Sequence, residues 1–155
     1  MRRFLVPLIL PRACAWITRH ERHILARGVA LNDAQLADAA ALGVAHPEKV
    51  RLLAVPRVPL PLAWLARFAR PLVGASFEQT SGLTAQFGIY LRSEVADDRH
   101  LIAHELTHTW QYERMGGIRP FLRQYLTECL TTGYLAAPLE EEARRAATDL
   151  CSRRS

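Results

Sequence analysis

The segment at residues 101–111, LIAHELTHTWQ, constrains the fold of this chain more than any other segment. Apolar residues recur along it at helical spacing, Asp97 or Asp98 stands before it as an N-cap, and a glycine pair at 116–117 follows it. We therefore predict a helix that ends at Met115. Because this helix carries two histidines and a glutamate among its apolar residues, the rest of the chain has to provide partners for them.

The H-E-L-T-H motif of this helix places His104, Glu105 and His108 together. Side chains four residues apart lie on one face of a helix, so both imidazoles can bind one metal ion while Glu105 lies beside them. A catalytic zinc ion needs three protein ligands and a water molecule, which zinc activates and a carboxylate such as Glu105 can deprotonate. The alternative is a pair of structural histidines. The motif favours a metal, because buried imidazoles and a buried carboxylate are costly without partners.

The third ligand has to be a carboxylate, because no histidine follows His108 in the sequence. An acidic run at 140–142 opens the last predicted helix, and the intervening turn and helix allow that last helix to return beside the first. Spacing favours Glu140, which shares a helix face with Ala143, a small residue that lets two helices approach closely. The alternative is that all three glutamates are present because carboxylates stabilise a helix N-terminus.

Helix and strand signals divide the first half of the chain. Gly28 ends a predicted helix whose apolar stripe consists of Trp16, Ile17, Ile24 and Leu25. A second helix, NDAQLADAAALG, has Asn32 as N-cap, Gln35 in the capping-box position and Gly43 as its stop. The run VRLLAV at 50–55 then predicts a strand.

The second half begins with a predicted helix at about 61–70 and continues with a hairpin, whose Thr-Ser-Gly turn lies at 80–82 and whose last strand lies at 89–91. After the H-E-L-T-H helix we expect a helix at 120–134 and a last one from Pro138. The predicted fold class is α+β, with a small antiparallel sheet or hairpin beside the H-E-L-T-H helix and a mostly helical C-terminal half.

Composition indicates one globular domain spanning residues 1–155, since 50% of the residues are hydrophobic and 23% are charged. The net charge of +5 comes from 19 Arg and one Lys that are scattered along the chain, so we expect no nucleic-acid partner. Cys14, Cys129 and Cys151 are odd in number and show no C-x-x-C spacing, which argues against a disulfide framework and against a cysteine zinc site.

The N-terminus, MRRFLVPLILPRACA, imitates a secretory signal peptide with its two arginines and short apolar run. Pro7 interrupts that run and Arg12 follows it closely, so we expect part of a folded helix and a cytoplasmic protein. Secretion is the alternative. We expect no membrane span, because no apolar run is long enough to cross a bilayer.

The runs HELTHTWQ and PLEEEAR together resemble gluzincin-type zinc metallopeptidases. They look most like short bacterial members that carry H-E-L-x-H-x-x-Q and a late P-x-E-x-E-A-R, and the likeness covers about residues 80–145. The resemblance implies a minimal zincin-like fold, with His104, His108 and Glu140 as zinc ligands and Glu105 as the general base of peptide-bond hydrolysis.

Two features of the family pattern are missing from the sequence. Arg144 stands where the larger gluzincins have an aspartate four residues after the ligand glutamate, so another acceptor has to orient a ligand histidine. We expect Glu128 in that position, with a surface location as the alternative. No oxyanion-stabilising residue is evident; Tyr134 is our candidate, with Tyr125 as the second choice.

Two functions fit these features. The first is a zinc-dependent metallopeptidase acting on a peptide or protein substrate, which would pair with the edge of the strand around Tyr90. The second is a catalytically inactive binding or structural protein that zinc stabilises. The small size of the chain favours the second function, whereas Glu105 favours the first, because a structural zinc site has no need of a base beside the metal.

Overall fold

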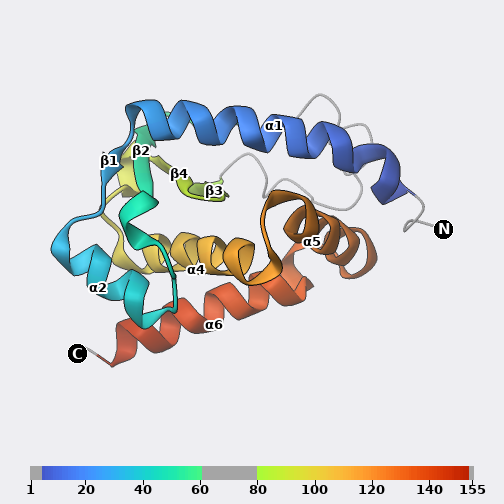
Figure 1. Cartoon of the computed structure of the whole chain (residues 1–155). Coiled ribbons are helices and arrows are strands. Elements are labelled where there is room, and N and C mark those ends of the chain that lie inside the picture. Colours follow the sequence, from blue (N-terminus) through green and yellow to red (C-terminus); the bar gives the residue numbers. More distant parts are fainter. Residues whose placement is uncertain (1–4, 61–79, 154–155) are drawn as a thin grey trace.

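The computed structural model describes residues 5–60 and 80–153 of the chain. Helix α1 (Val6–Arg27) lies along one face of a small sheet, and α4 (Arg99–Met115) lies along the other (Figure 1). Helix α6 (Pro138–Ser152) packs on α4, and α5 (Ile118–Thr132) packs on α1. The fold is therefore α+β, as the sequence predicted, and it is mostly helical.

Four strands form one mixed sheet in the order β1-β2-β4-β3; they are β1 (Val29–Ala30), β2 (Arg51–Val55), β3 (Gly82–Ala85) and β4 (Gly88–Arg92). The β1–β2 and β3–β4 pairs are antiparallel, whereas β2 and β4 run parallel. The expectation of an antiparallel sheet is therefore wrong. A parallel pair needs a long connection between its strands, and here that connection contains β3.

The hairpin of β3 and β4 turns at Gln86 and Phe87, since Ala85 pairs with Gly88. The turn that we predicted at 80–82 is wrong, because Gly82 is already the first residue of β3. Gln86 has a φ of 55°, in the left-handed region that glycine usually occupies, so the sequence carries no sign of this turn. Neighbouring helices hold the turn: Glu21 of α1 accepts the amide of Phe87, and Thr109 of α4 donates to the carbonyl of Gln86.

Strand β4 lies inside the sheet, which corrects the expectation that the strand around Tyr90 offers a free edge. The edge strand on this side is β3. Alternate residues of β4 belong to different apolar clusters: Tyr90 packs with residues of α1 and α5, and Ile89 and Leu91 pack with residues of α2 (Asp33–Ala41) and α4.

The capping signals gave the right helix ends in several places. Asn32 and Gln35 form a capping box at the start of α2, and Asp98 caps α4 by accepting two backbone amides. Helix α4 ends at Met115 before Gly116, whose φ is 90°. Helix α6 begins at Pro138 as predicted.

Other helix predictions need correction. Helix α5 ends at Thr132, so Tyr134 lies outside it, in a short 3-10 helix (Tyr134–Ala136). Helix α1 begins at Val6, and it buries Ile17 and Ile24 as expected but leaves Leu25 41% exposed. Two further 3-10 helices span Pro47–Lys49 and Ser93–Val95. The helix predicted at 61–70 lies outside the described residues.

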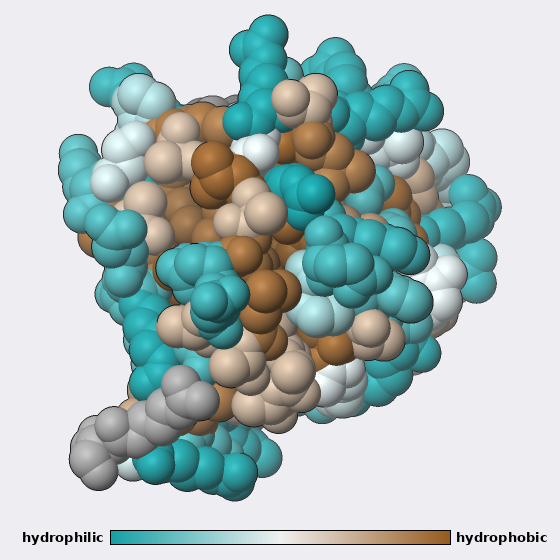
Figure 2. All heavy atoms as spheres, turned by 60° about the vertical axis from the view of Figure 1, so that its left-hand side comes forward, coloured by the Kyte–Doolittle hydropathy of each residue, from teal (hydrophilic) through white to brown (hydrophobic). Residues whose placement is uncertain are grey.

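The end of the molecule that carries β1 and α2 shows apolar surface ringed by hydrophilic side chains (Figure 2). Val29 of β1 is 67% exposed there, so this strand is the solvent edge of the sheet. Strand β3 at the opposite edge packs on α4 instead. Within the described ranges, no helix combines the length and the hydrophobicity that crossing a membrane requires.

Candidate metal centre

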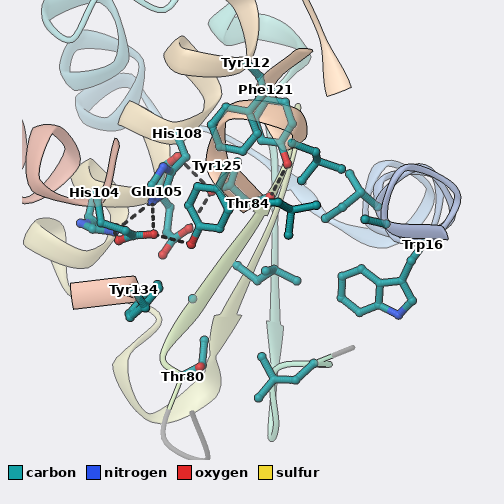
Figure 3. A pocket seen from close by; sticks show the side chains of 18 residues that line it. Trp16, Thr80, Thr84, His104, Glu105, His108, Tyr112, Phe121, Tyr125 and Tyr134 are labelled. Atoms are coloured by element: carbon teal, nitrogen blue, oxygen red, sulfur yellow. Dashed lines mark hydrogen bonds and ion pairs between the residues drawn. The ribbon is translucent and has the colours of Figure 1, made fainter. Parts of the chain in front are cut away.

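His104 and His108 lie one turn apart on α4 and point the same way (Figure 3). Their Nε2 atoms are 3.1 Å apart, and the two rings are nearly perpendicular, with an interplanar angle of 83°. His108 is buried and His104 is partly buried. The helix therefore presents two imidazole nitrogens to one point at the edge of the domain core.

Glu140 of α6 reaches the same point. One carboxylate oxygen lies 3.3 Å from Nε2 of His104, and the other lies 3.4 Å from Nε2 of His108. The two helices come close enough for these contacts because α6 places Ala143, which is fully buried, against the core. The neighbouring Glu141 points away and pairs with Arg145.

The spacing of these three side chains fits a tetrahedral metal ion. Ligand bonds of about 2.0–2.1 Å at tetrahedral angles separate the donor atoms by roughly 3.3–3.4 Å, which is close to the observed distances. Oε2 of Glu140 is fully buried and accepts no hydrogen bond, so a cation bound at this point would offset the cost of its burial. Among the described residues, His104, His108 and Glu140 form the group that could hold a metal ion.

The electrostatics of the site point in the same direction. Burial lowers the pKa of His108, but the carboxylate of Glu140 outweighs it and raises the pKa to about 9. Burial alone would raise the pKa of Glu140, whereas the charge of His108, the close contact with His104 and the hydrogen bond from Tyr125 hold it far below its ordinary value. The site therefore favours positive charge beside Glu140, and a divalent cation supplies that charge when it displaces the imidazole proton.

Gln111 fixes the orientation of His108. Its amide nitrogen donates to the carbonyl oxygen of Leu139 and to Glu142, so its amide oxygen is left to accept from Nδ1 of His108 at 2.8 Å. Because Nδ1 carries this hydrogen, the Nε2 lone pair of the neutral ring is free for a metal. Glu142 is in turn held by Arg114.

Glu128 does not occupy the position that we expected for it. One of its carboxylate oxygens accepts the backbone amide of Leu139, and the other accepts from Gln124. Glu128 thus supports the start of α6, and Gln111 orients the ligand histidine instead. The H-x-x-Q spacing is a signal for this role, because a residue three positions after His108 lies on the same helix face.

Tyr125 and Tyr134 both lie beside the cluster (Figure 3). The hydroxyl of Tyr125 donates to Glu140 at 2.6 Å, so this residue orients a candidate ligand. Burial and the nearby Glu140 raise the pKa of both phenols, which keeps them neutral and able to donate. Tyr134 lines the space in front of the histidines, where a substrate would have to lie.

Glu105 is buried beside the two histidines and faces the same space. Thr84 of β3 donates to its carboxylate at 2.6 Å. The side chain of Glu105 also lies against Gly82, where an added Cβ would come within 2.5 Å of Oε1. Sequence reasoning missed both Thr84 and Gly82, because their closeness to Glu105 depends on how β3 packs against α4.

Two hollows meet at this site. An apolar cavity of about 140 Å³ extends from the histidines toward α1, and a more polar groove of about 390 Å³ runs past the start of α4. The residues that line both are Thr80, Gly82, His104, Glu105 and Tyr134. The candidate metal centre is therefore open to a ligand that enters from the groove.

Comparisons with protein-family models, with curated proteins and with solved structures find no match for this chain. The chemistry of the site therefore rests on its own side chains. These comprise two imidazoles, one buried carboxylate between them and a second carboxylate within the same hollow.

Proposed function

We propose that this chain is a zinc-dependent metallopeptidase of the gluzincin type. The observation that carries the proposal is the convergence of His104, His108 and Glu140 at metal-ligand spacing, with Glu105 in the same hollow. A packed core needs neither the three candidate ligands nor the carboxylate of Glu105. Together they are the parts that metal-assisted hydrolysis requires.

Zinc is the metal that suits this donor set. Two histidine nitrogens and one glutamate oxygen form a ligand set of catalytic zinc, which keeps a fourth position open, whereas structural zinc is closed by four protein ligands. When bound, zinc supplies a water molecule of lowered pKa and polarises a substrate carbonyl. The described residues within reach of the site offer three ligands, which favours the catalytic kind.

The chain's own residues have separate roles in this proposal. Glu105 accepts the proton of the attacking water and delivers it to the leaving amine, and Thr84 holds the carboxylate in place through its hydrogen bond. Tyr134 faces the groove and donates to the carbonyl oxygen of the substrate as charge develops there. Tyr125 and Gln111 keep Glu140 and His108 oriented.

The substrate in this proposal is an extended peptide. The groove runs beside Ser81 and Gly82 at the start of the edge strand β3, whose backbone can pair with a peptide without demands on its sequence. Strand β3 thus takes the role that we first gave to the strand around Tyr90.

The alternative is a protein that uses zinc only to join α4 and α6, and which binds a partner without cleaving it. The position of Glu105 distinguishes the two functions. A structural zinc site gains nothing from a buried carboxylate that is not a ligand, and burying such a group is costly.

The deciding experiment compares wild type with Glu105→Gln at equal zinc content. We expect the variant to keep its zinc and its thermal stability, and to lose roughly 10²- to 10⁴-fold of its activity on unfolded casein, the usual contribution of a general base. Glu141→Gln, which changes an exposed carboxylate, is the matched control and should remain active. If fully zinc-loaded wild type cleaves neither casein nor any member of a broad peptide library, the peptidase proposal is wrong.

A further inference from the structure

The cavity beside the metal centre has walls from α1, β3 and α5, besides the residues of the metal centre itself. Helix α1 forms the wall farthest from the histidines, and β3 and α5 form the sides (Figure 3). Apolar residues that line it include Ala13, Trp16, Ile17, Leu83, Leu122 and Leu126. In Figure 3 the histidines and Trp16 lie on opposite sides of this space, so the cavity leads from the reacting centre into an apolar region.

We propose that this cavity binds one bulky apolar side chain of the substrate, of the size of phenylalanine or leucine, next to the bond that is cleaved. The inference rests on the proposed peptidase function. A peptide backbone in the groove passes His104 and Glu105, which line both hollows, and a side chain that turns inward from there enters the cavity.

The size of the cavity agrees with such a side chain. A cavity of about 150 Å³ lined by leucine, isoleucine and phenylalanine is known to bind benzene in another protein. The cavity here has a volume of about 140 Å³ and a similar lining. It therefore accommodates a phenyl ring or an isobutyl group, and it is too small for both together.

Three hydroxyl groups in the walls are already paired, so they offer no partner to a polar side chain in the cavity. The hydroxyl of Tyr112 donates to the carbonyl of Thr84, that of Tyr125 donates to Glu140, and that of Thr84 donates to Glu105. A charged or amide side chain that entered would lose its water and find no free partner among these groups. An apolar side chain loses nothing by leaving water there.

Ala13 and Ile17 of α1 determine how much space is available. They lie four residues apart on the buried face of the helix, and both line the cavity. Ala13 is only 4% exposed and carries a small side chain, so a larger residue at this position projects into the cavity. A smaller residue in place of Ile17 enlarges it.

The test measures binding, and it uses the zinc-loaded, full-length Glu105→Gln protein, which does not consume its ligand. Short blocked peptides that differ only in a central Phe, Leu, Ala or Asp are titrated by calorimetry. We expect the Phe and Leu peptides to bind roughly 10- to 100-fold more tightly than the Ala peptide, the value of burying one such side chain. The Asp peptide should bind most weakly. Equal dissociation constants for the Phe and Ala peptides would overturn the proposal.

Variants of α1 locate the effect. When Ala13→Leu is added to the Glu105→Gln protein, the preference for the Phe peptide over the Ala peptide should disappear. Ile17→Ala in the same background should extend the preference to a peptide with a central Trp. Ala15→Leu is the matched control, because Ala15 lies on the exposed face of the same helix, and it should leave the preference unchanged. Circular dichroism and zinc content show whether each variant is folded. If the Ala13→Leu variant is not folded, the result with Ile17→Ala decides whether the cavity sets the preference. A preference that neither cavity variant alters would contradict the inference.

Hydrolysis by wild type is measured separately with the same peptides. Selective binding without cleavage by zinc-loaded wild type would refute the peptidase function and leave the apolar subsite in place. Cleavage of all peptides at equal kcat/KM, together with equal binding, would refute the subsite and leave the peptidase function in place.

Discussion

Among single residues, Glu140 has the most demanding position, because its buried carboxylate contacts both histidines. Its partners satisfy only part of its hydrogen-bonding capacity. A side chain in such an environment is costly to the folded state unless a cation binds there. Its substitution therefore tests the ligand set directly.

We expect Glu140→Gln to weaken zinc binding at least tenfold, since even residues that only support a ligand change metal affinity by about 10- to 100-fold. Competition with a chromogenic chelator measures the affinity. Glu141→Gln serves as the control and should bind zinc like wild type, because Glu141 pairs with Arg145 at the surface. Equal affinities of the two variants would remove Glu140 from the ligand set.

Gly82 provides a second prediction at this scale. A methyl group on Gly82 would come within 2.5 to 2.9 Å of Oε1, Cδ and Cγ of Glu105, so Gly82→Ala has to displace most of that side chain. We expect kcat on a peptide substrate to fall roughly 100-fold, as misplacing a catalytic group by about 1 Å can do. Zinc content should stay near the wild-type value, because Glu105 is not one of the proposed ligands. An unchanged kcat would show that the position of Glu105 does not matter.

Among the elements, α1 and the hairpin are joined by a half-buried carboxylate. Glu21 of α1 accepts the amide of Phe87 at the turn between β3 and β4. Burial raises the pKa of Glu21 above 4.5, and the Phe87 amide and Arg22 offset only part of the change. The folded protein therefore binds the proton of Glu21 more tightly than the unfolded chain does.

This shift determines how stability responds to pH. A carboxyl group whose pKa is raised on folding favours the fold at low pH, and the stability is lost as the pH rises through the raised pKa. Glu21→Gln keeps an oxygen that can accept the Phe87 amide but carries no charge, so we expect it to raise the melting temperature at pH 7. The gain should disappear as the pH falls below about 4.5. Melting curves across this range measure it; a variant less stable than wild type at pH 7 would contradict it.

For the whole molecule, the candidate metal centre joins α4 to α6, so a bound ion links the helix of the histidines to the C-terminal helix. Figure 1 shows α6 lying along α4 on the side away from α1. A ligand that binds only the folded state stabilises it by an amount set by its concentration relative to Kd.

Removal of zinc should therefore lower the stability of the whole domain. Zinc at 100 times its Kd contributes about 2.7 kcal/mol, and for a chain of this size that corresponds to roughly 5–10 °C in melting temperature. Thermal unfolding with and without a chelator measures the difference. On removal of zinc, the melting temperature of Glu105→Gln should fall as much as that of wild type, and that of His104→Ala should not change. Equal melting temperatures of wild type with and without zinc would refute metal binding at this site.

Several parts of the fold were predictable because their signals are local. The capping box of Asn32 and Gln35, the Asp98 cap and the start of α6 at Pro138 depend on residues within one or two turns of each other. The direction of β2 relative to β4 and the turn at Gln86 depend on distant partners, and the sequence led to wrong predictions for both.

For the candidate site, the sequence by itself determined that His104, Glu105 and His108 share one helical segment, because helical periodicity places residues four apart on one face. Only the tertiary structure decided which residues surround them. Packing of α6 on α4 brought Glu140 to the histidines and placed Leu139 and Glu142 where they hold the amide of Gln111. Packing of β3 and α1 placed Gly82 under Glu105 and formed the cavity beside it. These contacts join residues far apart in the chain, and their distances depend on how whole elements pack, which no local pattern specifies.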